Sequence, residues 1–199
     1  MKIAKVRPPD PNWVSLPELK RPTGQSGIFD RRIADLDAQK MLDLSVDCCV
    51  TAGDFDKRIT QAMAMLSAAS ISFGIASTKG IEVWDKGTFF ITYMGTKAKS
   101  GSEEVSGDYS SFSRNFTEDL RPIAISASKR AIECFGRKAL PEKHIGPVVF
   151  ENVSWNELFS TIFTSGISAL NVQENRSVYK DKIGKQVAKE NVSVVDDGQ

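Results

Sequence analysis

The sequence has few of the side chains that build metal sites and disulfides. Its 199 residues include three cysteines, Cys48, Cys49 and Cys134, and one histidine, His144. Adjacent cysteines rarely bridge each other, so the sequence argues against a disulfide framework of the secreted kind and favours a reducing, cytoplasmic location. A membrane-spanning apolar run is missing too, and residues 1–9 carry charge and proline where a signal peptide needs an apolar stretch. We therefore expect a soluble protein that binds no membrane.

Net charge of one sign is missing as well. Lys and Arg number 26 against 25 Asp and Glu, which leaves a formal charge of +1 and no overall field to attract nucleic acid. Nucleic acid is therefore not an expected partner. The basic residues of the second half are dispersed among acids, as on a solvated face: Lys97, Lys99, Arg114, Arg121, Lys129, Arg130, Arg137 and Lys138. The chain does have 41% hydrophobic residues, enough for a core in one domain or in one large and one small unit.

Proline marks the start of the chain. Five of the eight prolines lie between Pro8 and Pro22, and such a density of proline prevents a regular helix. We therefore expect residues 1–29 to form an extended arm or linker. The apolar side chains expected to hold it to another surface are Trp13, Leu16 and Leu19.

Residues 30–114 carry the pattern of a helix followed by an antiparallel sheet. Asp30 can cap a helix over residues 31–52, where apolar residues keep helical spacing until Gly53 ends it. Because apolar and β-branched runs then alternate with turn residues, the sequence predicts an antiparallel meander.

The meander is expected to run from residue 58 to residue 109, with strands of about five to nine residues. Its predicted turns lie at residues 77–80 and 85–87, where glycine tolerates the positive φ of short connections. The polar residues 97–111 are expected to form a hairpin tip and an exposed edge strand.

Residues 115–199 are mainly helical in pattern. Asn115 or Thr117 can cap a helix that runs to residue 135, with Pro122 in its first turn. Together these segments predict an α+β fold in which helices flank an antiparallel β-meander.

Ser154, followed three residues later by Glu157, forms a capping box for a helix over residues 154–165. The other elements expected in this part are a short buried strand after Pro147, a short helix over residues 178–188 and, over residues 192–198, a strand that runs into a turn.

The sequence does not carry the residues of a zinc peptidase helix. Such a helix needs two histidines one turn apart and a glutamate that acts as general base on the bound water. His144 is the only histidine, and its place just before a predicted strand is interpreted as a loop position. A zinc set of Cys48, Cys49, Cys134 and His144 is disfavoured, because neighbouring cysteines on a helix point about 100° apart. The cysteines are interpreted as structural thiols.

Other kinds of catalytic or metal site find equally little support. Asp196 and Asp197 could serve as metal ligands, but their position before Gly198 favours a turn after a strand. A nucleophilic serine needs a base and a nucleophile elbow, and the only histidine lies in a context without a Gly-x-Ser-x-Gly elbow. The glycine-rich segments lack the lysine of a phosphate loop. We therefore assign no catalytic, cofactor-binding or metal-binding residue to this chain.

Six segments, taken in order, resemble the TldD/PmbA family, whose members were once called modulators of gyrase. They are a small turn at residues 77–80, an alanine-rich helix at 123–135, a Leu-Pro to Pro-Val segment at 140–148, a helix at 154–165, a Gly-Lys-x-Val segment at 184–187 and a closing Val-x-Asp-Asp at 194–197. Each motif alone is weak, and their order and spacing over residues 57–199 carry the resemblance.

The resemblance implies an assignment to one subunit type within the family. One type carries a His-Glu-x-x-x-His stretch on the helix after the Pro-Val strand, whereas this chain reads ELFSTIFTSGIS there, with Glu157 as its only acid. The resemblance therefore implies a PmbA/TldE-type subunit without catalytic residues. It would pair with a TldD-like catalytic subunit, which holds the zinc, in a peptidase that takes unfolded or short peptides.

Family members are longer at both ends, so the resemblance also implies that the fold is incomplete here, with residues 115–199 leading towards a C-terminal domain that is absent. Exposed sheet edges and apolar patches are then expected. The meander is expected to supply an interface edge, because apolar side chains occupy both faces of one strand: Phe89, Phe90, Ile91 and Tyr93.

Three alternatives stay open at the level of sequence. The chain could form a homodimer instead of a hetero-oligomer. It could be a metallopeptidase in which ligands on a missing C-terminal segment hold a metal together with acids of this chain such as Asp196 and Asp197. It could also be a nucleic-acid-binding module, which the old gyrase association of the family suggests more than these residues do.

Overall fold

The protein consists of two compact units, Met1–Lys138 and Ala139–Gln199. The computed structural model describes residues 25–139 and 145–195, together with residues 6, 8–11, 13–18 and 143. Six residues named above therefore lie outside the described residues: Leu19, Pro22, His144, Asp196, Asp197 and Gly198. Within residues 8–11 and 13–18 the Pro-rich arm contains no helix or strand, and its Trp13 and Leu16 are exposed.

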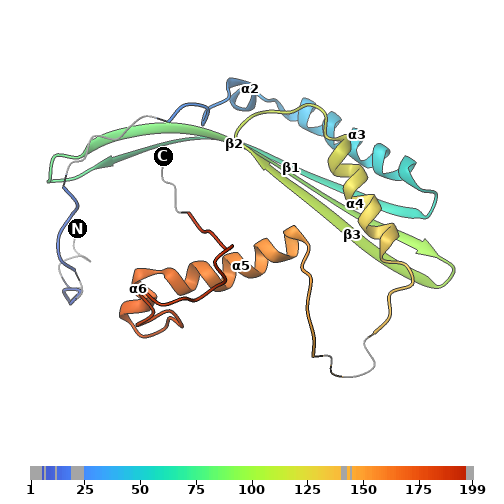
Figure 1. Cartoon of the computed structure of the whole chain (residues 1–199). Coiled ribbons are helices and arrows are strands. Elements are labelled where there is room, and N and C mark those ends of the chain that lie inside the picture. Colours follow the sequence, from blue (N-terminus) through green and yellow to red (C-terminus); the bar gives the residue numbers. More distant parts are fainter. Residues whose placement is uncertain are drawn as a thin grey trace. The chain divides into compact units, whose positions relative to one another are not determined.

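Three antiparallel strands form the sheet of the first unit: β1 (Ile59–Ala76), β2 (Glu82–Ser100) and β3 (Glu103–Ser113), in the order β1-β2-β3 (Figure 1). Gly80 (φ +84°) lies in the turn between β1 and β2, and Gly101 (φ +60°) lies in the turn between β2 and β3. Both conformations are readily adopted by glycine. The predicted antiparallel meander is confirmed, as are its turn at residues 77–80 and its polar hairpin tip.

The strands are much longer than expected. They contain 18, 19 and 11 residues, and the turn predicted at residues 85–87 is wrong because these residues lie within β2, paired with β1. Gly87 has a different reason to be glycine. A Cβ there would lie 3.0 Å from the Arg114 side chain and 3.4 Å from the carbonyl oxygen of Ile28, whose backbone accepts a hydrogen bond from Thr88.

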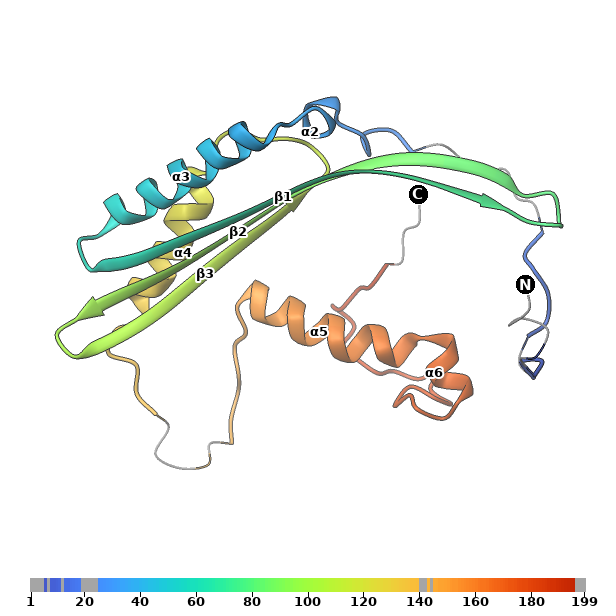
Figure 2. The same cartoon turned by 180° about the vertical axis from the view of Figure 1, so that it is seen from behind.

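Two helices, α3 (Ala38–Phe55) and α4 (Arg121–Glu133), cover the same face of this sheet (Figures 1 and 2). Even-numbered residues of β2 point towards them and are buried: Thr88, Phe90, Thr92, Met94, Thr96 and Ala98. Because side chains alternate along a strand, the odd-numbered residues of β2 lie on the opposite face, which no helix of this unit covers. We call this the open face. Since α4 belongs with the sheet, the first unit extends to Lys138, beyond the boundary expected at residue 114.

The helix predicted over residues 31–52 is interrupted. Asp30 caps the short helix α2 (Arg31–Ala34) by accepting a hydrogen bond from the Arg32 amide. Asp37 caps α3 in the same way, through the Lys40 amide at 2.7 Å. Gly53 does not end α3, which continues to Phe55, because this glycine is exposed and keeps a helical conformation.

Helix α4 begins later than predicted, and neither Asn115 nor Thr117 caps it. A long-range contact holds the preceding segment in place, since the Phe116 amide donates to the Asp30 carboxylate at 2.8 Å. Pro122 does lie in the first turn of α4, as predicted.

The second unit contains α5 (Asn152–Ile167) and the short α6 (Ala169–Gln173). The capping box of Ser154 and Glu157 is wrong, because α5 starts at Asn152 and takes Ser154 into its first turn. The strand after Pro147 is wrong within residues 145–150, which have no partner strand and leave Val149 96% exposed.

The helix predicted over residues 178–188 is replaced by turns, in which Asp181 and Gly184 have positive φ values that a right-handed helix excludes. The predicted strand over residues 192–198 is absent from its described part, residues 192–195. Of the helices in the described parts of both units, none combines the length and the apolar character that crossing a bilayer requires.

Asp30 joins three parts of the first unit. Its carboxylate binds the Arg32 guanidinium (2.7 Å) and the Phe116 amide, and its own amide donates to the Thr88 hydroxyl at 2.8 Å. The hydrogen bonds from the Arg32 side chain and from Phe116 hold the pKa of Asp30 well below its ordinary value.

Because the pKa of Asp30 is depressed, its contribution to folding stability is present above about pH 4 and is lost as the pH falls from there towards its folded pKa. We expect Asp30→Asn to lower the melting temperature at pH 7 and to reduce the acid dependence of stability. Melting curves followed by circular dichroism between pH 7 and pH 3 measure both effects. Asp54→Asn, at an exposed site, is the control; equal behaviour of the two variants would contradict the role of Asp30.

Candidate functional site

Helix α5 contains most of the segment, residues 157–168, that the resemblance aligns with the zinc-binding stretch of catalytic subunits, and several of its side chains are aromatic. Ring centroids lie 5.6 Å apart between Trp155 and Phe159, 4.5 Å between Phe159 and Phe163, and 5.9 Å between Phe163 and Tyr179. The steps of four residues place the three helical rings on one side of α5. Glu157, the only acid of this segment, is exposed.

A cavity of about 460 Å³ lies along this aromatic side of α5. Its walls are formed by Trp155, Leu158, Phe159, Ile162, Phe163, Tyr179, Val187, Ala188, Val192 and Val194. None of these side chains offers an imidazole, thiol or carboxylate, so the lining suits an apolar group and not a metal ion.

Cys48 and Cys49 are neighbours on α3, and Cys134 lies in a different cluster of the first unit. Cys48 is 2% exposed in the core between helix and sheet, and burial raises the pKa of its thiol to about 11. The Cys49 thiol donates to the carbonyl of Ala62, while Cys134 packs against a second cluster of buried residues. Within the described residues, no three His, Cys, Asp or Glu side chains group as ligands for a metal ion. The fourth residue of the possible zinc set, His144, lies outside the described residues. Among the described residues, the three cysteines do not come together with other ligands.

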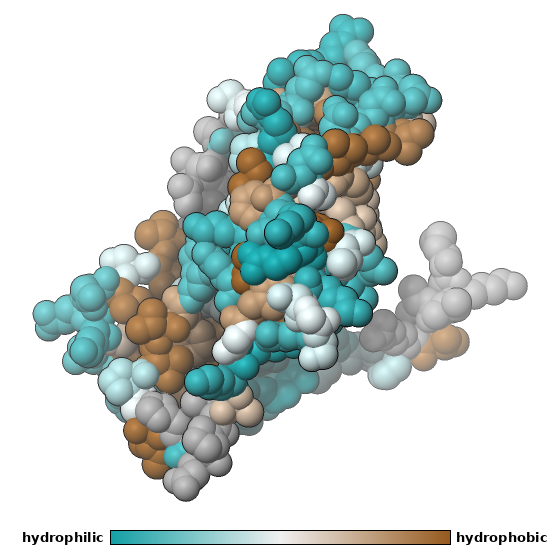
Figure 3. Space-filling model, turned by 90° about the vertical axis from the view of Figure 1, so that its right-hand side faces the viewer, coloured by the Kyte–Doolittle hydropathy of each residue, from teal (hydrophilic) through white to brown (hydrophobic). Residues whose placement is uncertain are grey.

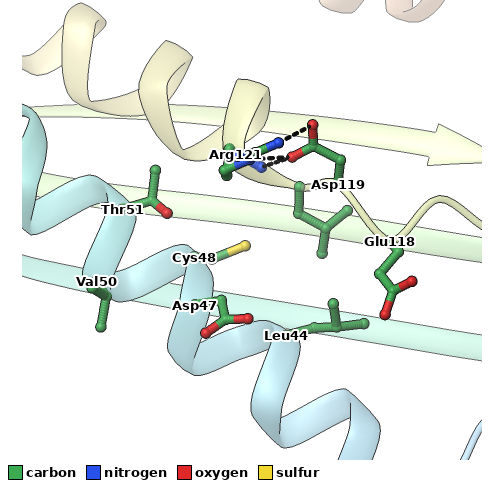
Figure 4. A pocket seen from close by; sticks show the side chains of 9 residues that line it. Leu44, Asp47, Cys48, Val50, Thr51, Glu118, Asp119 and Arg121 are labelled. Atoms are coloured by element: carbon green, nitrogen blue, oxygen red, sulfur yellow. Dashed lines mark hydrogen bonds and ion pairs between the residues drawn. The ribbon is translucent and has the colours of Figure 1, made fainter.

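A second cavity, of about 530 Å³, lies between α3 and the start of α4 (Figure 4). Its floor includes Cys48, and two of the carboxylates at its rim are paired within the fold. Asp119 accepts hydrogen bonds from Arg121 at 2.7 and 2.9 Å, and Glu118 is bound by Lys40. The raised pKa of the thiol argues against a nucleophilic role, so this hollow has no evident catalytic set.

The open face of the sheet carries exposed apolar side chains. Met63 and Met65 of β1 are both 58% exposed, and Phe112 of β3 is 61% exposed and stacks against Phe89 at 6.0 Å. Figure 3 shows the molecule from the right-hand side of Figure 1, where hydrophobic residues lie at the surface between hydrophilic ones. A soluble domain that leaves such a face uncovered commonly uses it for binding.

The residues predicted as an interface divide between the two faces. Phe89, Ile91 and Tyr93 lie on the open face and are partly buried, whereas Phe90 is 2% exposed and packs edge-on against Phe116 beneath the helices. Apolar side chains thus occupy both faces of β2, as expected, but Phe90 belongs to the core. The methionines were missed, although the alternation Met63-Ala64-Met65 on β1 is a readable sign of one exposed and one covered face.

Strand β1 forms one edge of the sheet, because its only partner strand in the described residues is β2. Its 18 residues include no charged residue and no proline, and its one register shift lies at its start, between Ile59 and Gln61. Charges, prolines and bulges are the usual means by which edge strands avoid pairing with other chains. An edge of this kind is therefore suited to receive a further strand.

The β1–β2 ribbon also continues beyond β3. Pairing of β2 with β3 ends at Phe90 and Ser113, whereas pairing with β1 continues to Ala76 and Glu82. The side chains that are exposed along this two-stranded part are Ile71, Phe73, Ile75 and Trp84. Isolated two-stranded ribbons are marginally stable in water, so this part too gains from a binding partner.

Comparison with known proteins agrees with the two units. A family model described as the PmbA/TldA metallopeptidase central domain matches residues 31–135, and one described as the C-terminal domain of the same metallopeptidases matches residues 143–199. The segment expected to lead towards a C-terminal domain thus itself matches that domain from residue 143 onward.

Individual relatives are similar over most of this chain. The MJ0231 protein of Methanocaldococcus jannaschii is 29% identical over 175 residues, which are 86% of this chain and 39% of the relative. A Thermotoga maritima protein described as a modulator of a DNA gyrase has a structure with a TM-score of 0.78 and 26% identity, over 87% of this chain and 40% of that one.

TldE from Thermococcus kodakarensis, at 19% identity, shares the fold with a TM-score of 0.72 over 91% of this chain and 41% of its own. This chain thus spans about two fifths of the length of each of these three relatives. Its two domain matches, over most of its residues, show that it belongs to the PmbA/TldD family of metallopeptidase-related proteins.

Proposed function

We propose that this chain acts as a non-catalytic subunit of a peptidase complex, in which a TldD-like partner holds the zinc ion. The observation that supports this role is the aromatic side of α5. Where the resemblance places the zinc-binding stretch of catalytic subunits, this chain has Phe159 and Phe163 in stacked contact beside an apolar cavity. An apolar lining favours packing and gives no ligand to a metal ion.

The first unit supplies surfaces that suit such a role. The uncharged edge of β1 and the exposed apolar side chains of the open face can support an extended peptide or contact another subunit. Unfolded or short peptides are the substrates we propose for the complex, because an extended main chain can pair with a strand edge only when it is not already folded. The three free cysteines of this chain agree with the cytoplasmic, reducing location that we propose for it.

Co-purification tests the proposal. The full-length form of this protein is produced with and without TldD-like subunits from the same source, and zinc content and cleavage of an unfolded, fluorescently labelled casein are measured. We expect a stable pair that contains zinc and cleaves, and no chelator-sensitive cleavage by this protein alone. A TldD-like subunit with its two zinc-binding histidines replaced is the matched control and should pair without cleaving. Zinc binding and cleavage by this protein alone would overturn the proposal.

A further inference from the structure

We propose that the open face is the contact surface between two copies of this chain, which pack face to face around a two-fold axis at Ile91. The order of residue types along the open side of β2 is the same in both directions from Ile91: an aromatic residue, a glycine and a charged residue. These residues are Phe89, Gly87 and Asp85 on one side, and Tyr93, Gly95 and Lys97 on the other. A second copy is a partner beyond the proposed function, and it leaves the free edge of β1 uncovered.

A surface with this order of residues is complementary to itself. Around a two-fold axis, residue i of one copy meets residue j of the other, and residue j meets residue i. When the axis lies between the two sheets and crosses the strands, the strands of the two copies run antiparallel. Each residue of β2 then faces the residue that is equally far from Ile91 on the other side. Phe89 of each copy therefore faces Tyr93 of the other, which places two aromatic pairs beside the axis.

The charges at the two ends of this pattern have opposite sign. Asp85 and Lys97 each lie six residues from Ile91, which is about 20 Å along a strand. Antiparallel packing brings Asp85 of each copy to the end where Lys97 of the other copy lies, whereas parallel packing would bring like charges together. Lys97 is only loosely paired within its own chain, because its Nζ lies 3.9 Å from a carboxylate oxygen of Glu104. Charge complementarity thus favours a second copy in the antiparallel arrangement.

The relief of the face follows the same symmetry. Gly95 lies in a hollow of about 660 Å³ whose lining includes Asp108. At the matching position, Gly87 is covered by Arg114, since a Cβ built on Gly87 would lie 3.0 Å from a guanidinium nitrogen. In the antiparallel pair, Arg114 of each copy points towards the hollow of the other, where the carboxylate of Asp108 offers it a partner.

The neighbouring strands add apolar surface on both sides of β2. The strand register places Ser67 of β1 and Phe112 of β3 beside Ile91, so all three lie in the row that the axis follows. Met63 and Ile71, both exposed, lie four residues from Ser67 in opposite directions and would face each other across the contact. Two sheets that pack in this way lie about 10 Å apart. The contact then has an apolar centre and charged ends, as protein interfaces commonly do.

An exchange of charge between the two ends tests the contact. Sedimentation velocity measures dimerisation of this chain alone over a range of protein concentrations. We expect the parent chain to dimerise, and Asp85→Lys and Lys97→Glu each to weaken dimerisation at least about tenfold, because like charges then meet. A mixture of the two variants should form a one-to-one dimer, since each end again joins a lysine to an acid. Asp54→Lys, on the helix α3 that covers the other face, is the control and should dimerise like the parent chain.

Cross-linking locates the axis. Ser67→Cys places an exposed thiol in the axial row, so a bis-maleimide of about 10 Å should join two copies. Ser110→Cys is the matched control, because Ser110 is also exposed on the open face but pairs with Tyr93, two residues away from the axis. It should be linked much less. The parent chain gives the background from the three native cysteines.

A parent chain that stays monomeric at every concentration, single charge variants that dimerise like the parent, or a mixture that stays monomeric would overturn the contact. If circular dichroism shows that a charge variant does not fold, the cross-linking comparison decides, and equal linking at residues 67 and 110 would overturn it. No TldD-like subunit, zinc or cleavage enters these measurements, so failure here leaves the subunit proposal intact. Dilution returns the chain to the monomer, in which the open face is exposed.

Discussion

Gly107→Ala is expected to destabilise the first unit strongly, although it adds a single methyl group. Gly107 lies on β3 beneath α4, where a Cβ would come within 2.2 Å of the Ala131 amide nitrogen and 2.6 Å of the Ala127 carbonyl oxygen. Both are helix backbone atoms that no rotamer change can move. Helix α4 would have to leave the sheet, and with it the 3.1 Å hydrogen bond from the Thr96 hydroxyl to Ala127 would break.

Overpacking typically costs about 1–3 kcal/mol and more where the backbone must shift, so we expect a loss of at least about 3 kcal/mol in the free energy of unfolding. Urea denaturation followed by circular dichroism measures it. Gly53→Ala is the matched control, because Gly53 is a helical glycine with open space around its Cβ position and alanine there should stabilise α3 by about 0.5–1 kcal/mol. Similar urea midpoints for the two variants would show that α4 does not pack against β3 as described.

Met94→Ala is expected to have the second largest effect. Met94 lies at the centre of β2, is fully buried and belongs to the main core cluster with Leu44 and Ala124. Truncating a buried methionine removes apolar contacts and leaves a cavity, at a cost of about 2–5 kcal/mol.

The same substitution at Met65 provides the comparison. Met65 lies on the neighbouring strand but is 58% exposed on the open face, so Met65→Ala should change the free energy of unfolding by less than about 0.5 kcal/mol. Urea titrations of both variants give the two values. Equal losses of unfolding free energy in the two variants would mean that the side chains of the open face are buried as well as those beneath the helices.

The sequence correctly located the turns in which glycine is needed for its positive φ. Gly80 and Gly101 have positive φ and were expected in turns. Gly87 was misassigned because its purpose is close approach to Ile28 and Arg114, residues far away in the sequence. A single sequence does not distinguish these uses of glycine, and this one position accounts for the underestimated length of β2.

Helix limits differ from prediction for a similar reason. The break between α2 and α3 had a local sign in Asp37, which is a typical capping residue. The late start of α4 had none, because the contact between Asp30 and Phe116 joins segments that are distant along the chain. Likewise the apolar run after Pro147 suggested a buried strand, but a strand forms only where a partner is present.

The candidate surfaces were only partly readable. The run of apolar residues in β2 correctly indicated apolar side chains on both faces, whereas which face the helices cover depends on α3 and α4 together. The open face also has a hollow of about 660 Å³ around Gly95, which depends on three strands meeting in register and which periodicity within one segment does not specify.

The uncharged edge of β1 has a consequence for the supply of this protein in the cell. An edge without charges or prolines has little to prevent it from adding strands of its own kind, so chains made in excess of their partner would accumulate as aggregates or be degraded. If the partner proposed above covers this edge, synthesis of the two chains in matched amounts, in the same place and at the same time, would limit such aggregation. Gene dosage, as much as sequence, would set how much of it survives.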